Sequence, residues 1–363
     1  MKPLAILFAG QGTQKPEMFK ELANSENRNL AKAAEEVLDV FKSLGTDASD
    51  IFDIYYNNGV DPVKISHTRN VQPGLAAYLT TLYMALENEL GHKLVPYVAS
   101  GRSFGVIPSL YALGVLSLED MLNVALMRGE SMSLIKPGQY SVMTMKTDEP
   151  VRISWMNWKV LRRTGYRVCI IDSEDIISIS GPLEAKDKVE ERLESYGVVA
   201  TRIPIKDDVF YAPFHNGPEM GPYSGVFKHG LIRYCRRREM GTDEKVFKDT
   251  NDGFFVTNGN RVRISTDGKW IMDYISSDHI VQLCDFRRTM QKTGELADDC
   301  IGIGQMNFQK RCSDVNGYIK DFFVLQNPSK LTEALHFYET IPERELEPTP
   351  IPDRTLAQPY QTA

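Results

Sequence analysis

Short apolar runs that end at a glycine turn and lead into a helical pattern are the feature that most constrains this fold. Leu4–Ala9 is one such run and ends at Gly10, and Leu94–Ser100 is a second, ending at Gly101. Helical patterns follow, with apolar residues spaced along 75–90 and 121–135. Because strand and helix alternate, this part of the chain predicts the α/β fold class, with a parallel sheet covered by helices.

The pattern changes between residues 138 and 205. Four strand-like segments surround two helical stretches there, in the order strand, helix, strand, strand, helix, strand; the strands are Tyr140–Met145, Val168–Asp172, Ile176–Ser180 and Val198–Ile205. This order is typical of a ferredoxin-like unit. We therefore expect a small subdomain (138–205) inserted into a large domain (1–137 and 206–340), followed by a tail (341–363) with five prolines.

Composition argues against several classes of function. The formal net charge of −6 over 363 residues gives no bulk attraction to nucleic acid or to an anionic membrane. The longest apolar run has six residues, whereas a spanning helix needs about 20. The five cysteines form no CxxC pair, which favours a reducing compartment and disfavours a zinc ribbon. We expect a cytoplasmic protein of enzyme size, without nucleic-acid or membrane partners.

Gly101-x-Ser103-x-Gly105 lies between an apolar strand and an apolar helix. A nucleophile elbow needs this arrangement, because the sharp turn exposes the serine hydroxyl and the glycines leave room for neighbouring chain. The helix N-terminus behind the serine favours a developing oxyanion. The alternative is a glycine turn whose serine caps the next helix. None of the six histidines is selected as a base by spacing, since catalytic partners meet in space.

Several short motifs follow one another in a distinctive order: Phe8-Ala9-Gly10-Gln11-Gly12-Thr13-Gln14, Val71-Gln72-Pro73, Gly101–Gly105, Met127–Met132, Ile179–Pro182, Ala212–His215 and Thr257-Asn258. In this order they resemble the malonyl-CoA:acyl carrier protein transacylase family, the acyltransferases of fatty acid and polyketide synthesis. The resemblance covers residues 4 to about 260. It implies an α/β-hydrolase-like large domain with a parallel sheet plus an inserted ferredoxin-like small subdomain.

The resemblance also implies roles for individual residues. Ser103 would be the nucleophile and His215 its base, without a carboxylate as a third member. The backbone amides of Gln11 and Phe104 would form the oxyanion hole. Arg128 would bind the free carboxylate of a malonyl group as a bidentate fork. The other substrate-binding candidates are Gln72, Phe214, which is associated with malonyl over branched units, and Arg102.

This chain departs from the family pattern Gly-His-Ser-x-Gly-Glu at two places. Arg102 replaces the histidine and Val106 replaces the glutamate. The cation of Arg102 would either support the oxyanion, bind phosphate or distort the elbow, or it would belong to a surface arginine paired with a nearby carboxylate. Near the carboxyl end, Gly302-Ile303-Gly304 retains only part of a family landmark.

The implied activity is transfer of a malonyl or related acyl group from coenzyme A to the phosphopantetheine thiol of an acyl carrier protein, through a seryl ester. No metal and no bound cofactor is expected. An acidic carrier would dock on a basic patch, for which the candidates are Arg233, Arg236, Arg237 and Arg238; the alternative is a solvated basic face. Two rival functions are an acyl-thioester hydrolase, which Arg128 argues against, and a non-catalytic carrier-binding scaffold, which the departures favour.

Overall fold

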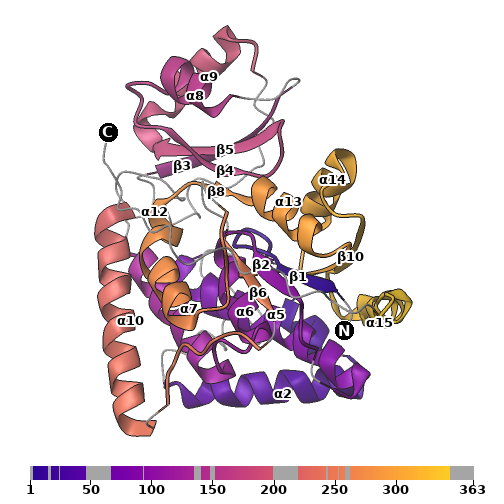
Figure 1. Ribbon diagram of the computed structural model, residues 1–363. Coiled ribbons are helices and arrows are strands. Elements are labelled where there is room, and N and C mark those ends of the chain that lie inside the picture. The colour runs from indigo at the N-terminus through magenta and orange to yellow at the C-terminus, as the bar shows by residue number, and fades with distance from the viewer. Residues whose placement is uncertain are drawn as a thin grey trace.

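A six-stranded sheet forms the centre of the molecule (Figure 1). The structure is a computed structural model that describes residues 3–14, 18–23, 25–45, 67–92, 94–134, 140–147, 152–198, 220–242, 244–251, 253–257 and 262–343. In spatial order the strands are β10 (Asp321–Leu325), β9 (Asp299–Ile303), β1 (Leu4–Phe8), β2 (Val98–Gly101), β6 (Phe254–Val256) and β7 (Ile264–Ser265). Neighbours are parallel except β6 and β7. The mixed α/β class predicted from the sequence is confirmed.

Strand β1 shows why the first apolar run specifies this sheet. All five of its residues are buried, as expected for a central strand of a parallel sheet with both faces covered. Phe8 pairs with Gly101 at the end of β2 on one side and with Ile303 at the end of β9 on the other. The carboxyl ends of these strands therefore meet at one edge, where the Gly10 and Gly101 turns lie together.

Helices cover the large sheet (Figure 1). They are α1 (Met18–Ala23), α2 (Arg28–Ser43), α5 (Thr68–Leu90), α6 (Val106–Ala112), α7 (Leu118–Met132), α10 (Met220–Thr242), α11 (Gly268–Asp273), α12 (His279–Val281), α13 (Phe286–Leu296), α14 (Asn307–Asn316) and α15 (Leu331–Thr340). In the described ranges, no helix has both the length and the apolar character needed to cross a membrane. All five cysteines are buried and free.

Helix α5 begins earlier than the sequence predicts. The helical pattern in the sequence covers 75–90, but His67 caps the helix by accepting a hydrogen bond from the backbone N–H of Arg69. Pro73 consequently lies in the second turn, where it has no N–H to donate to the Arg69 carbonyl. A Cβ at Gly129 of α7 would lie 3.1 Å from that carbonyl oxygen, so the glycine lets α7 pack closely on α5 at this point.

A second, four-stranded sheet has the order β3-β5-β4-β8. Strands β3 (Tyr140–Lys146) and β4 (Arg167–Ile171) both pair antiparallel with β5 (Ile176–Pro182), which is the central arrangement of a ferredoxin-like unit. Helix α9 (Lys186–Ser195) and α8 (Ile153–Trp155), continued by a π-helical turn to Val160, contribute to its small core. The predicted strand Val198–Ile205 lies outside the described residues beyond its first position.

Strand β8 (Cys284–Asp285) is the unexpected member of this small sheet. It comes from the later part of the chain, more than 100 residues after β4, and pairs parallel with β4 through Ile170 and Cys284. Figure 1 shows β8 beneath β4, between the small sheet and the elements of the large sheet. The two sheets are therefore joined by backbone pairing as well as by the connecting chain.

Candidate functional site

The turn after β2 has the backbone geometry of a nucleophile elbow. Ser103 has a φ of +50°, and the only other described non-glycine residue with positive φ is Arg163. Such a conformation costs on the order of 1–3 kcal/mol and concentrates at functional sites. Residues 103–105 form a 3-10 turn that leads directly into α6, which therefore starts behind the serine. The cap positions are taken by Arg102 and Gly105, so Ser103 is not the helix cap of the alternative reading.

Three glycines make this elbow sterically possible. A Cβ at Gly101 would lie 2.1 Å from the carbonyl carbon of Gly105, and one at Gly105 would lie 2.3 Å from the carbonyl oxygen of Phe8. A Cβ at Gly10 would meet the carbonyl oxygen of Arg102 at 2.3 Å. Separations below 3.0 Å are essentially never tolerated between such atoms. The ends of β1 and β2 therefore approach each other only because glycine occupies these positions.

Gln11 and Gln72 form a hydrogen-bonded pair beside the elbow. The Gln72 amide donates to Gln11 Oε1 at 3.1 Å, and the Gln11 amide donates to Thr68 Oγ1 at 3.1 Å. Gln72 is fully buried in α5 and also contacts the Met132 sulfur at 3.3 Å. Helix α5 thus holds Gln11, three residues after the end of β1, whose backbone amide is a candidate oxyanion donor. Gln72, a predicted substrate-binding residue, lies where it supports Gln11.

Phe104 and Arg128 lie against each other behind Ser103. The Phe104 side chain is fully buried, and the Arg128 Cζ lies 5.6 Å from its ring centroid. Only 1% of Arg128 is exposed. Within the described part of the chain, its Nε and Nη2 have no hydrogen-bond partner. Burial lowers the pKa of the guanidinium to about 9, against the opposite influence of Cys284 and Tyr274. The site therefore contains a buried cation with unfilled donors, which is suited to bind an anionic group.

Arg102 forms a bidentate ion pair with Asp172. Its Nε donates to Oδ1 at 2.6 Å and its Nη2 donates to Oδ2 at 2.8 Å. The two side chains are only 13% and 1% exposed, so this is not the surface pair considered from the sequence. A carboxylate that occupies two guanidinium nitrogens neutralises the cation, which argues against a free charge for phosphate or oxyanion.

Apart from His215, the histidines of the chain all lie in the described ranges. His67 caps α5, while His92, His229 and His336 are exposed. His279 is buried against Tyr274, with ring centroids 5.6 Å apart, next to the π-helical turn Tyr274–Asp278. His215 and Phe214 lie outside the described residues, so their predicted roles stay predictions. Among the residues described, no group of histidine, cysteine, aspartate or glutamate side chains is arranged to hold a metal ion.

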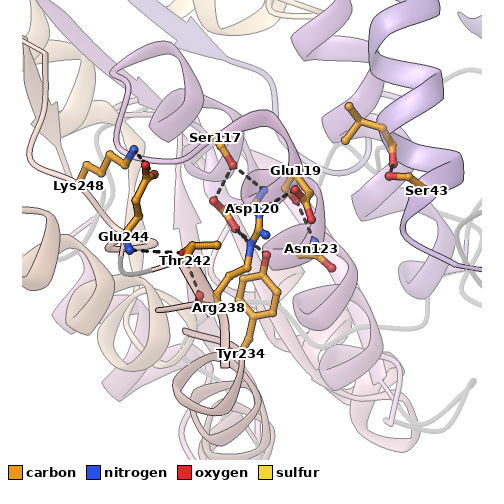
Figure 2. A network of polar contacts seen from close by, with 11 residues as sticks. Ser43, Ser117, Glu119, Asp120, Asn123, Tyr234, Arg238, Thr242, Glu244 and Lys248 are labelled. Atoms are coloured by element: carbon orange, nitrogen blue, oxygen red, sulfur yellow. Dashed lines mark hydrogen bonds and ion pairs between the residues drawn. The ribbon is translucent and has the colours of Figure 1, made fainter. Parts of the chain in front are cut away.

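Helix α7, which carries Arg128, is fixed to α10 by a polar network at its first turn (Figure 2). Asp120 accepts hydrogen bonds from the Tyr234 hydroxyl at 2.6 Å and from Arg238 Nε at 3.4 Å. Arg238 also pairs with Glu119 at 2.6 Å. Arg238 is therefore committed to this network, whereas the other basic-patch candidates, Arg233, Arg236 and Arg237, are exposed.

Two residues of this site were not predicted from the sequence. Asp172 was recognised only as the end of a strand, and Cys284 belongs to a two-residue strand without a motif. A carboxylate directly after a buried strand was the one available signal for Asp172. Nothing in the sequence pointed to Cys284, because its neighbours at the site come from segments far away in the chain.

Comparison with known proteins gives one family and a consistent fold. Residues 6–210 match the family described as "Acyl transferase domain". A malonyl CoA-acyl carrier protein transacylase from Staphylococcus aureus (strain MRSA252) is 33% identical over 228 residues, which is 60% of this chain and 65% of that protein. For the transacylase of strain MSSA476, the aligned region spans 40% of its length. The chain thus aligns with less than two thirds of these curated relatives.

Solved structures resemble a larger part of the chain. The crystal structure of FabD from Acinetobacter baumannii has a TM-score of 0.73 at 20% sequence identity, over 92% of this chain and 98% of that one. A type II polyketide synthase malonyl-transacylase, solved in complex with its acyl-carrier protein, has a TM-score of 0.74 at 18% identity, over 92% and 99%. At these identities the likeness shows the fold, including both sheets.

Proposed function

Because the chain belongs to the acyl transferase domain family, we propose that it moves a malonyl or related acyl group from coenzyme A to the phosphopantetheine thiol of an acyl carrier protein. The observation that carries the proposal is the strained Ser103 elbow with the buried Arg128 next to it across Phe104. The names of the relatives, which are malonyl transacylases, support the same donor and acceptor.

The first half-reaction forms an ester on Ser103. The Ser103 Oγ attacks the thioester carbonyl while His215 accepts its proton, which gives a tetrahedral intermediate with a negative oxygen. The backbone amides of Gln11 and Phe104 stabilise that oxygen. The intermediate then expels the coenzyme A sulfur, which takes the proton back from His215. The hydrogen bond from Gln72 to the side chain of Gln11 supports the role of Gln11 in the oxyanion hole, because it restrains the loop after β1.

The second half-reaction is the same chemistry with a different thiol. The phosphopantetheine thiol of the carrier gives its proton to His215 and attacks the seryl ester, and Ser103 leaves with that proton. Catalysis therefore needs one acyl-binding site that both thiols reach in turn. No metal or bound cofactor takes part in either step.

Arg128 supplies the acyl preference in this proposal. A malonyl group ends in a carboxylate, and the buried guanidinium has two nitrogens available for it among the described contacts. Fork-to-fork pairing of a guanidinium with a carboxylate is bidentate and stronger than a neutral hydrogen bond. The aromatic face of Phe104, 5.6 Å from the Arg128 Cζ, adds a favourable interaction with the cation.

The fate of the acyl-enzyme tests this proposal against the hydrolase and the scaffold. The protein is loaded with malonyl-CoA, freed of excess donor, and divided between buffer and buffer containing a phosphopantetheinylated carrier protein. Intact masses of both proteins are then followed. We expect the malonyl group to move to the carrier much faster than it is lost to water. Equal loss in both samples, with unmodified carrier, would identify a hydrolase, and a protein that never loads would be a scaffold.

A further inference from the structure

The nucleophile elbow is braced by the small sheet as well as by its own glycines. On the large-sheet side, Gly10 and Gly105 let the backbone of the elbow pack against the end of β1. On the opposite side, two consecutive elbow residues, Arg102 and Ser103, make polar contacts with strands β4 and β8 of the small sheet. The small-sheet residues in these contacts, Asp172 and Cys284, lie outside the family motifs.

The first contact is the ion pair of Arg102 with Asp172. Asp172 directly follows β4, and its backbone N–H donates to the carbonyl of Ile176 at 3.0 Å, which fixes the turn between β4 and β5. Both carboxylate oxygens are used, at 2.6 and 2.8 Å. A buried bidentate pair allows little change in the relative position of its two backbones. Arg102 is therefore held at a defined distance from the end of β4.

The second contact joins the nucleophile itself to β8. The backbone of Ser103 lies close enough to the Cys284 thiol to lower the pKa of that thiol by hydrogen bonding. Burial raises the pKa of that thiol to about 12, although Arg102 and this hydrogen bond act in the opposite direction, so the thiol is neutral at physiological pH. Its role at the site is that of a compact acceptor that fits a buried backbone donor.

The two contacts close a ring of interactions around the elbow. Cys284 pairs with Ile170, and Asp285 pairs with Ile171, in the β4–β8 ladder. Asp172 is the next residue of the β4 chain and returns to Arg102 through the ion pair. A shift of either elbow residue would have to break an ion pair, a hydrogen bond or the strand pairing. The left-handed φ of Ser103 is thus maintained from outside the elbow.

We propose that Asp172 and Cys284 are positioning residues, which hold Ser103 in its strained conformation by bracing the elbow from the small sheet. The inference rests on the proposed function, since it concerns the reactivity of the Ser103 hydroxyl. Loss of either contact relaxes the backbone and moves Oγ away from the attack geometry, where a shift of about 1 Å costs roughly a hundredfold in rate. Binding of the acyl donor depends on neither contact.

The test compares two buried ion pairs of similar exposure. Asp172→Asn removes the bidentate pair near Ser103. Asp285→Asn is the matched control, because it leaves the backbone pairing of Asp285 with Ile171 intact, and the Asp285 side chain, 3% exposed, pairs with Arg287, 14% exposed, and not with the elbow. Pre-steady-state acylation by malonyl-CoA gives the rate and the KM separately, and thermal midpoints report stability. We expect Asp172→Asn to lower the acylation rate at least tenfold at a KM within twofold, while Asp285→Asn keeps the rate within twofold.

Cys284 variants keep the inference testable if Asp172→Asn folds poorly. Cys284→Ser retains an acceptor for the Ser103 N–H and should retain most of the rate, whereas Cys284→Ala should lose it. A serine-directed sulfonyl fluoride measures Ser103 reactivity without any acyl-CoA, so a failure of the proposed function leaves this test intact. Asp172→Asn and Cys284→Ala both reacting within twofold of wild type, or Asp285→Asn losing as much as Asp172→Asn, would overturn the inference.

Discussion

Arg128 is a buried cation to which we assign one function, binding of the acyl carboxylate. Its guanidinium is buried and has unfilled donors among the described residues, so an uncharged acyl group leaves it unpaired. Arg128→Ala should therefore lower malonyl transfer by about 30-fold or more, from a penalty of roughly 2–5 kcal/mol, and change acetyl transfer little. Competition between the two donors for the same enzyme measures this ratio. An equal fall for both donors would show that Arg128 does not bind the carboxylate.

Burial of the Arg128 guanidinium also predicts that removing its charge makes the protein more stable. A buried ion without a compensating partner carries a desolvation penalty of several kcal/mol, so Arg128→Met should raise the thermal midpoint while acyl preference is lost. Burial lowers the pKa of Arg128 to about 9, so the unfolded chain binds more protons than the folded protein between pH 9 and the ordinary pKa of arginine.

The cost of the buried charge is therefore fully present below pH 9 and shrinks as the pH rises. The stability advantage of Arg128→Met should accordingly be larger at pH 7 than at pH 10, as measured by urea unfolding. An Arg128→Met protein that is less stable than wild type at pH 7 would contradict this prediction.

Single residues differ in how well the sequence predicted them. Ser103 and Arg128 lie in recognisable sequence motifs. In the structure Ser103 has a positive φ and Arg128 is buried with unfilled donors among the described residues, and their roles stay predictions. The sequence leaves several roles open for Arg102. The ion pair with Asp172, which is visible only in three dimensions, argues against a free charge on Arg102. The Cys284 contact with Ser103 joins positions 181 residues apart, a relation that no local pattern contains.

Among elements, the junction of β1, β2 and α6 depends most sharply on glycine. Gly105→Ala would place a methyl group 2.3 Å from the Phe8 carbonyl oxygen, and backbone atoms there cannot move aside. We expect a marked fall in the free energy of unfolding together with loss of Ser103 acylation. Gly225→Ala in α10 is the control, since a Cβ there meets nothing within 4 Å. Helix propensity should make that variant about 0.5–1 kcal/mol more stable. Unchanged stability and acylation in Gly105→Ala would refute the packing argument.

Long periodic elements were predicted well and short ones were not. The unbroken apolar run of β1 and the helical spacing of apolar residues in α5 and α7 specify buried elements, although α5 starts earlier because a histidine supplies its cap. Strand β8 has two residues, too few to show any periodicity, and its pairing with β4 depends on the docking of the two sheets. The ferredoxin-like order of the small sheet was predicted for its first three strands, but not its extension by β8.

On the scale of the whole molecule, the exposed arginines of the long helix α10 are the basic patch that we propose for docking of an acidic carrier. Arg233, Arg236 and Arg237 are exposed, whereas Arg238 is held by Glu119 and Asp120 (Figure 2). Replacing the three exposed arginines by alanine should raise the KM for the carrier several-fold at low salt and leave the KM for malonyl-CoA unchanged.

Arg311→Ala on α14, which Figure 1 places on the other side of the molecule, is the control for loss of a surface cation. If the triple variant and Arg311→Ala have the same KM for the carrier, the docking surface lies elsewhere.

In the proposed reaction, Ser103 carries the acyl group between the two thiols. The most direct measurement is the intact mass of the protein after brief mixing with malonyl-CoA, followed by peptide mapping of the modified residue. We predict that wild type gains one malonyl group on Ser103 and that Ser103→Ala gains none at an unchanged thermal midpoint. A wild-type protein that never acquires this mass, or that acquires it on another residue, would contradict the account.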